Sequence, residues 1–261
     1  MNGRYKQGGD SKGASGGGWS GTRAFKVALK TRESAKIASF YLSPADGSDL
    51  PGFDPGQYIE LKLMIEGQEV RRKYSLSDAP TGMEYRISVE RQLGGTASTY
   101  LHDCVAEGDI VEAFAPSGSF RLRENDGPLV LISSDIGIMP MMAMLRVALQ
   151  TSRAVYFIHE AKYGGTDTFL DFVDYLASSH QKVKRFYIHG KPQLERVTDD
   201  TSCGINEDCL RKWLPPCEDA DVYLAGSESF IRRLKQTLSV LHVPKDRCRY
   251  EIFDLSAQHR P

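Results

Sequence analysis

The sequence has no cysteine pattern typical of a disulfide framework or a metal cluster. Its five cysteines, Cys104, Cys203, Cys209, Cys217 and Cys248, are scattered along the chain. An odd, scattered set does not indicate paired disulfides. The sequence has neither a CxxC pair nor a ferredoxin-like ligand spacing, so we expect no iron–sulfur cluster and no metal site. A reducing, cytoplasmic location is the simplest interpretation.

The sequence also lacks long apolar runs and an excess of charge of either sign. No apolar segment approaches the roughly 20 residues that span a bilayer as a helix. Residues 1–18 are rich in Gly and Ser and have no apolar region typical of a signal peptide, so we expect a disordered tail there. The formal net charge is −1 over 261 residues. We therefore expect neither nucleic acid nor a membrane as a partner.

The first half of the chain, residues 19–124, consists of short strand patterns separated by turns. Phe25, Val27 and Leu29 alternate with other residues as in a half-buried strand. Further strands are predicted over 37–42, 59–65, 85–89 and 108–112, and after the turn at 116–120. Short strands with only one short helical pattern, at 100–103, indicate an antiparallel β-barrel.

The second half, residues 125–261, has a different pattern, and the change falls at the turn sequence of residues 124–127. Leu129 to Ile132 form a continuous apolar run, as expected for a strand buried on both faces. Strands at 154–158, 185–188, 222–224 and 249–253 alternate with helices at 141–149, 169–176, 206–213 and 229–241. This alternation predicts an α/β nucleotide-binding domain with a doubly wound parallel sheet, which binds ligands outside the carboxyl ends of its strands.

The segment from Arg72 to Asp78 contains three side chains that could bind one cofactor together. A guanidinium at Arg72 can clamp a pyrophosphate with its rigid fork of donors. The phenol of Tyr74 can lie along a flat ring system, and the hydroxyl of Ser75 can reach a ring nitrogen or carbonyl. A flavin dinucleotide needs all three groups. The alternative is an ordinary strand with an exposed arginine and a half-buried tyrosine.

A glycine turn at Gly94-Gly95-Thr96-Ala97-Ser98 leads into the short helical pattern. Such a turn presents free backbone N–H groups and the positive end of the helix dipole, and Ser98 adds a hydroxyl. This arrangement predicts an anion site. The alternative is a turn without a ligand, since many glycine turns precede helices and bind nothing.

The order of the motifs is more specific than any one of them. A barrel carries Arg-x-Tyr-Ser-Leu-Ser, a Gly-x-x-Ser turn and Pro-x-Gly-x-Phe, and a nucleotide-type sheet then ends on Tyr-Glu-Ile-Phe at 250–253. This order resembles the ferredoxin–NADP reductase superfamily. Within it, residues from about 18 to 253 are similar to the C-terminal reductase half of flavohaemoglobins, the nitric oxide dioxygenases. The N-terminal globin of those proteins has no counterpart here.

The resemblance implies a role for each residue of the FAD motifs. Arg72 would bind the FAD pyrophosphate, Tyr74 the flavin edge and Ser75 the reactive N5/O4 side, with Leu76 and Ser77 completing the motif. The turn residues Gly95, Thr96, Ala97 and Ser98 would hold phosphates.

The resemblance also implies that the end of the chain closes the far side of the flavin. Glu251 would lie there together with Phe253, which would lie near the ring face. Tyr74, Ser75 and Glu251 are thus the candidate catalytic residues. The alternative for Phe253 is a core aromatic on a terminal strand.

The sequence departs from the family pattern on the nicotinamide side. Where the family typically has Gly-Val-Gly-Ile-Thr-Pro, the sequence at 135–140 reads Asp-Ile-Gly-Ile-Met-Pro. Asp135 adds a negative charge facing two phosphates, and each like-charge contact costs about 1 kcal/mol in a solvated setting. Met139 replaces a hydroxyl, and Ala225 replaces a cysteine that lies beside the nicotinamide ring.

Other positions on the nicotinamide side are kept or only mildly changed. Gly137, Pro140 and Gly226 match the family pattern, so they are expected to contact the cofactor. Lys162 stands where an arginine is usual. Lys191 is either a ligand of a 2′-phosphate or a solvated loop residue.

Two functions fit these observations. The first is an FAD-dependent NAD(P)H oxidoreductase that passes electrons to a separate acceptor, such as a separately encoded globin, another protein or a small molecule. The second is an FAD-binding protein with a degenerate nicotinamide site, acting on another substrate or as a regulatory or scaffolding module. Drift at tolerant positions is the alternative explanation for each departure. Since all of them weaken one ligand's site, we expect FAD binding to persist and NAD(P)H binding to be weakened.

Overall fold

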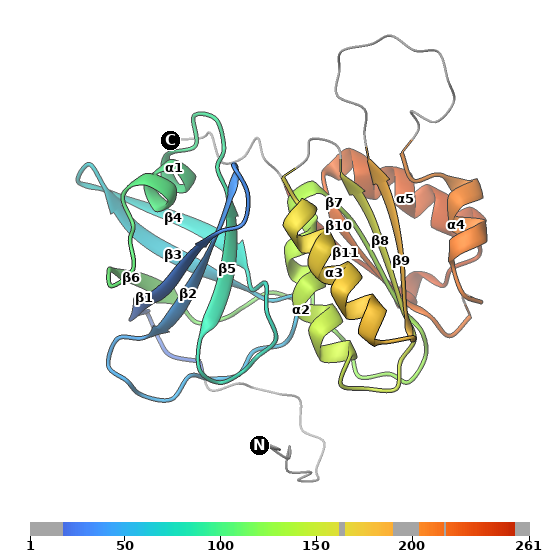
Figure 1. Cartoon of the computed structure of the whole chain (residues 1–261), viewed down its shortest axis with the longest axis horizontal. Helices are drawn as coiled ribbons and strands as arrows, with labels where there is room; N and C mark the ends of the chain where they lie inside the picture. The colour runs from blue at the N-terminus through green and yellow to red at the C-terminus, as the bar shows by residue number, and fades with distance from the viewer. Residues whose placement is uncertain (1–17, 162–164, 190–203, 217, 254–261) are drawn as a thin grey trace.

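The computed structural model describes residues 18–161, 165–189, 204–216 and 218–253, which form two sheets side by side (Figure 1). One sheet is antiparallel with the order β4-β3-β6-β1-β2-β5, and the other is parallel with the order β11-β10-β7-β8-β9. The predicted fold class, a β-barrel followed by a doubly wound α/β domain, is confirmed. The strands of the first sheet are β1 Thr22–Arg32, β2 Ile37–Pro44, β3 Tyr58–Ile65, β4 Gln68–Ser75, β5 Tyr85–Glu90 and β6 Ile110–Phe114. Those of the second are β7 Leu129–Ser134, β8 Val155–Ala161, β9 Val183–His189, β10 Asp221–Gly226 and β11 Cys248–Ile252. The helices are α1 Thr96–Asp103, α2 Ile138–Ala148, α3 Asp167–Ser179, α4 Glu207–Trp213 and α5 Glu228–Val240, with 3₁₀ turns η1 Asp135–Gly137 and η3 Lys245–Arg247.

The antiparallel sheet curls into a barrel because its alternating apolar residues share one interior. The largest buried side chains of this core include those of Phe25, Phe40, Ile59 and Ile87. The edge strands β4 and β5 approach each other through a single bridge between Leu76 and Ile87, which closes the sheet. Helix α1 covers one end of the barrel and buries its apolar side in the same core.

The parallel sheet has helices on both faces. Every residue of the central strands β7 and β10 is buried, as their continuous apolar sequences predict. Helices α2 and α3 pack on the face nearer the barrel, and α4 and α5 pack on the opposite face (Figure 1). Across the described residues, no helix combines the length and the apolar character that crossing a membrane requires.

The structure differs from the sequence-based expectations mainly in the barrel, where residues 68–75 form a strand, β4, that was not among those predicted. Helix α1 begins at Thr96, four residues before the predicted helix, because the turn at Gly95 already starts the helical backbone. The strand predicted after the turn at 116–120 is not formed, apart from an isolated bridge between Tyr58 and Ser117. There the chain is leaving the barrel, and its backbone bonds to loops instead, as in the 2.9 Å bond from Leu122 N–H to Pro55 O.

The predicted boundary between residues 124 and 125 lies in the segment that connects β6 with β7. The division into domains at that position remains a prediction. The predicted tail, residues 1–18, lies almost entirely outside the described residues, since the described chain begins at residue 18.

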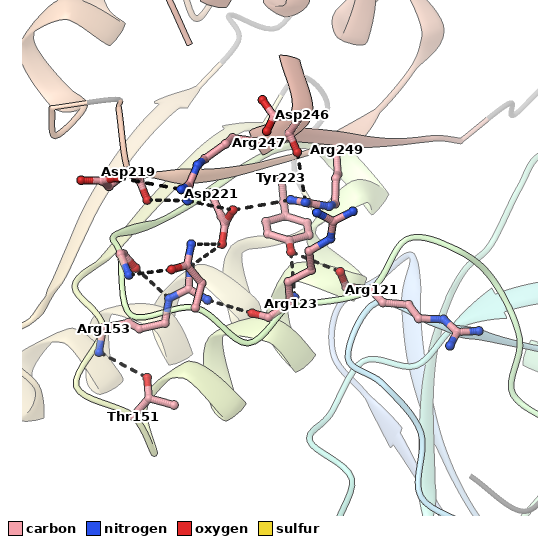
Figure 2. A network of polar contacts seen from close by, with 12 residues as sticks. Arg121, Arg123, Thr151, Arg153, Asp219, Asp221, Tyr223, Asp246, Arg247 and Arg249 are labelled. Atoms are coloured by element: carbon pink, nitrogen blue, oxygen red, sulfur yellow. Dashed lines mark hydrogen bonds and ion pairs between the residues drawn. The ribbon is translucent and has the colours of Figure 1, made fainter. Parts of the chain in front are cut away.

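A buried ion pair fastens this connecting segment to the amino-terminal edge of the parallel sheet (Figure 2). Arg153 and Asp221 lie 3.1 Å apart, and each side chain is only 4% exposed. The remaining donors of Arg153 bond to the backbone carbonyls of Gly127, at 2.8 Å, and Arg123, at 3.1 Å. Asn125 donates to the same carboxylate at 2.8 Å. The Arg153 guanidinium thus joins its own loop to the connecting segment at 123–127 and to the start of β10.

Replacing Arg153 by Met should lower the free energy of unfolding by about 3–5 kcal/mol, because the buried Asp221 would lose its hydrogen-bonded arginine and the carbonyls of Gly127 and Arg123 would lose their donor. The measurement is chemical denaturation followed by circular dichroism. The matched control is Arg232→Met, whose pair with Glu228 is 68% and 70% exposed; it should change stability by only about 0.5 kcal/mol. Equal, small effects of both substitutions would contradict the structural role given to Arg153.

Candidate functional site

A cavity of about 390 Å³ lies between the barrel and the parallel sheet. The barrel lines it with residues of β3, β4, β5 and α1. The parallel sheet lines it with residues from the loop and helix after β7 and from the end of β11. The cavity is therefore at the carboxyl edge of the sheet, where the fold class predicts a ligand.

Strand β4 brings the three residues of the predicted flavin motif to this cavity. Arg72, Tyr74 and Ser75 all line it, opposite Leu61, Ile59 and Tyr58 of β3 in the antiparallel register. Burial raises the pKa of the Tyr74 phenol well above its ordinary value, and the charge of Arg72 opposes that shift only in part. Tyr74 therefore remains a neutral hydroxyl that can donate a hydrogen bond.

The turn before α1 contributes backbone donors to the same region. The first helical hydrogen bond runs from Thr99 N–H to Gly95 O at 3.0 Å, which leaves the N–H groups of the first three helical residues outside the helix ladder. Ser98 lines the cavity, but its hydroxyl already accepts from Gln92 N–H at 3.1 Å and donates to Gly95 O at 3.3 Å. The Ser98 hydroxyl therefore stabilises the turn before α1.

Four other residues of the predicted motifs do not line the cavity, and three of them are buried beside it in the barrel. Leu76 is fully buried in the barrel core, and Ser77 is fully buried with its hydroxyl 2.8 Å from that of Ser88. Ala97 is buried in the same core, whereas Thr96 is exposed at the helix start. None of these four is among the residues that line the cavity.

The end of β11 forms the opposite wall. Glu251 and Phe253 both line the cavity, and the Phe253 N–H donates to Gly226 O at 2.9 Å, which continues the pairing with β10. Burial raises the pKa of the Glu251 carboxyl, and the nearby Lys73 ammonium partly opposes this. A proton can therefore reside on Glu251 at higher pH than on an exposed glutamate.

The loop after β7 packs closely against β10. A Cβ on Gly137 would lie 2.3 Å from Ala225 O, so only glycine fits there. Asp135 has φ +46°, in the left-handed region that favours glycine. Ile136 and Met139 from this segment line the cavity, whereas Pro140 is buried within α2.

The positions expected beside the nicotinamide are tightly packed within the protein. Ala225 is fully buried. A Cβ on Gly226 would lie 2.4 Å from the hydroxyl of Ser134. Packing alone therefore accounts for glycine at both 137 and 226, and their contact with a cofactor stays a prediction. Lys162 and Lys191 lie outside the described residues.

Several cavity residues were missed at the sequence level. Ser88, Glu90 and Gln92 line it from β5 and the turn beyond, and Tyr58 and Lys73 line it from β3 and β4. The period of two along a strand could have found Ser88 and Glu90, because they share one face of β5. Burial raises the pKa of the Glu90 carboxyl, and the charge of Asp135 acts in the same direction.

The parallel sheet contains a fully buried histidine. His159 of β8 has its Nδ1 2.8 Å from the hydroxyl of Ser133 and its Nε2 3.3 Å from that of Thr166, just before α3. Burial lowers its pKa from 6.5 to about 3, with a smaller contribution from His189. His159 is therefore neutral over the ordinary pH range and acts as a polar bridge between the sheet and α3.

Comparison with known proteins agrees with this geometry. Residues 24–122, which include the barrel strands, match the family described as "Oxidoreductase FAD-binding domain". The structure also matches that of the flavohaem-like FAD/NAD-binding domain of nitric oxide dioxygenase from Vibrio cholerae. The TM-score is 0.76 and the identity 34%, over 88% of this chain and 98% of that one. The chain belongs to the family of flavohaem-like FAD/NAD-binding domains.

Relatives in longer proteins extend the comparison. The chain is 52% identical to a flavohemoprotein from Burkholderia sp. strain TH2 over 91% of its length, and 46% identical to one from Pseudomonas aeruginosa over 92%. It spans 60% and 61% of the length of those two proteins. Similarity to the family therefore covers both sheets of the present structure.

The neutral state of His159 makes stability depend on pH. Because the unfolded chain takes up a proton near pH 6.5 that the folded chain accepts only near pH 3, stability should fall as the pH drops through this window. This one group contributes about 1.4 kcal/mol per pH unit. Denaturation curves at several pH values should show a shallower pH dependence for His159→Gln than for the wild type. His180→Gln, at a half-buried histidine, is the control, and an unchanged slope in the His159 variant would contradict the assignment.

Proposed function

We propose that this chain is an FAD-dependent oxidoreductase that takes electrons from a reduced nicotinamide and delivers them to a separate acceptor. The observation that carries the proposal is the cavity itself. It brings Arg72, Tyr74 and Ser75 of the barrel opposite Glu251 and Phe253 of the parallel sheet. A flavin dinucleotide requires this combination of a cationic fork, aromatic walls and hydroxyl donors.

The residues present fit FAD in chemistry. A cavity of about 390 Å³ is within the usual range for small-molecule sites, which is roughly 300–1,000 Å³. Arg72 would hold the pyrophosphate, and the turn from Gly95 to Ser98 would bind phosphate oxygens through the N–H groups of residues 96–98 at the start of α1, since the Gly95 N–H already donates to Gln92 O. When bound, FAD accepts two electrons from a nicotinamide and releases them singly.

The side chains of this chain would then orient and protect the flavin. Tyr74, whose burial keeps its hydroxyl protonated, would donate to the flavin edge, while Ser75 would face the N5/O4 side. Phe253 would cover one ring face and exclude water. Glu251, with its raised pKa, would hold or release a proton at its carboxyl close to the reacting edge.

A specific observation favours a second function, an FAD-binding protein with a degenerate nicotinamide site. Asp135 has a backbone conformation that favours glycine, and the resemblance to the family implies that its carboxylate would face the pyrophosphate of a nicotinamide cofactor. Met139 presents a thioether to the cavity in place of a hydroxyl. These features would weaken NAD(P)H binding without touching the FAD motif.

The acceptor and the cellular setting belong to the same proposal. A globin is a natural acceptor, because the relatives from Burkholderia and Pseudomonas are flavohemoproteins; a small molecule would serve equally well. A cytoplasmic location is consistent with the scattered cysteines. Among the described residues, no group of His, Cys, Asp or Glu is arranged to hold a metal ion, and the proposal requires none in this chain.

Replacing Arg72 by Gln should weaken FAD binding about 10- to 100-fold, because a charge-assisted hydrogen bond to an anion contributes about 1.5–3 kcal/mol. Quenching of flavin fluorescence on titration into apoprotein measures the dissociation constant. The control is Arg185→Gln, on the far edge strand β9. An affinity for FAD that is unchanged in the Arg72 variant would remove Arg72 from the cofactor site.

Restoring the family residues with Asp135→Gly, Met139→Thr and Ala225→Cys together should raise the diaphorase rate with NADH or NADPH. Asp135→Gly alone is the variant least prone to disturb the fold, because glycine is unstrained at φ +46°. Anaerobic titration of the holoprotein should show slow or weak bleaching of the wild-type flavin band. Rapid bleaching at micromolar nicotinamide, or no gain in either variant, would show that these positions do not limit turnover.

A further inference from the structure

Three arginines share one buried carboxylate at the amino-terminal edge of the parallel sheet (Figure 2). Asp221 is 3% exposed. Its Oδ2 accepts from Asn125 at 2.8 Å and from Arg153 at 3.1 Å. Its Oδ1 lies 3.8 Å from Arg247 and 3.6 Å from Arg249, too far for strong hydrogen bonds. This cluster carries more positive than negative charge.

One arginine of this cluster, Arg249, is incompletely satisfied. Nη1 of Arg249 is buried and has no hydrogen-bond partner among the described residues. Asp219, the other nearby carboxylate, is 3.8 Å from Arg247 and 85% exposed, so water screens it. A partly buried surplus of charge is costly unless a counter-charge is present.

A fourth guanidinium is directed toward Arg249. The backbone N–H of Arg123 donates to the Tyr223 hydroxyl at 2.9 Å, and the guanidinium of Arg249 lies 5.6 Å from the centre of the same ring. In Figure 2 the Arg123 side chain extends past this ring toward Arg249. Its guanidinium has no salt bridge within the part of the chain that the structure describes. Tyr223 thus anchors the backbone of Arg123 and lies beside the guanidinium of Arg249. The Arg123 side chain is exposed, so an anion from solvent can reach the space between these two like charges, which repel each other without one.

We propose that Arg123 and Arg249 form an oxyanion site, and that its ligand is a phosphate group. Two guanidinium forks match the tetrahedral oxygens of phosphate better than a single-atom ion such as chloride. None of Arg123, Tyr223 and Arg249 lines the cofactor cavity, so the site is separate from that proposed for FAD. It does not depend on the proposed function.

The position of the site gives its occupancy a structural consequence. Arg123 lies on the segment that leaves the barrel, whereas Arg249 lies on β11, two residues before Glu251. A bound phosphate would link these two segments across the seam between the sheets. It would thereby steady the strand that carries Glu251 to the cavity wall.

Thermal unfolding of the protein saturated with FAD tests the proposal. Inorganic phosphate replaces chloride at constant ionic strength, and a saturable rise in Tm is expected, because a ligand that binds only the folded state stabilises it. Arg123→Gln and Arg249→Gln should each abolish the rise. Arg72→Gln should retain it, which excludes binding at the cofactor cavity.

Adenosine monophosphate is the second ligand to test. A rise in Tm at lower concentration than with phosphate identifies a nucleotide phosphate as the ligand, and an equal or smaller rise identifies free phosphate.

The charge-reversal variant Arg123→Glu gives an independent readout. Its carboxylate would take the place of the anion beside Arg249, so its Tm without phosphate should exceed that of Arg123→Gln, and phosphate should add nothing. The exposed variant Arg232→Gln should respond to phosphate as the wild type does. The proposal is overturned if phosphate fails to raise the Tm of the wild type, or if Arg123→Gln responds as strongly as the wild type.

Discussion

The relative position of the two sheets depends on the burial of the Asp221 carboxylate. This group lies at the start of β10, and the chain satisfies it with Arg153 and Asn125, which come from different segments. Arg153 then uses its remaining donors on the backbone that connects the barrel to the sheet. A buried charge tolerates little rearrangement of its partners, so the exit from the barrel is fixed against the edge of the sheet.

That constraint matters for the cavity because its walls come from both sheets. Arg72, Tyr74 and Ser75 are carried by an edge strand of the barrel, whereas Glu251 and Phe253 are carried by or follow an edge strand of the parallel sheet. Neither sheet alone would enclose a flat ring. Close packing at Gly137, whose Cβ position is filled by the carbonyl of Ala225, holds the loop that carries Ile136 and Met139 to the cavity against β10.

The sequence predicted the elements and their order because local periodicity determines them. The strand predicted from Phe25, Val27 and Leu29 and the one predicted from the unbroken apolar run of β7 are both observed, although a bulge after Val27 leaves Leu29 exposed. Six residues that the sequence singled out line one cavity in the structure: Arg72, Tyr74, Ser75, Ser98, Glu251 and Phe253. Their roles toward a cofactor remain predictions. Sequence patterns could not predict the segment after Phe120, because its backbone partners, Pro55 and Tyr223, are distant in the chain. For the same reason the polar bridge of His159 to Ser133 and Thr166 was not foreseen.

The placement of β11 has a consequence for how the protein matures. This strand is added to the sheet through one neighbour only, β10, and it supplies an entire wall of the cavity. During synthesis the barrel and most of the sheet can fold on the ribosome before residues 248–253 emerge. The pocket would then stay open along one side until these residues have been made, and only after that could it enclose a bound molecule.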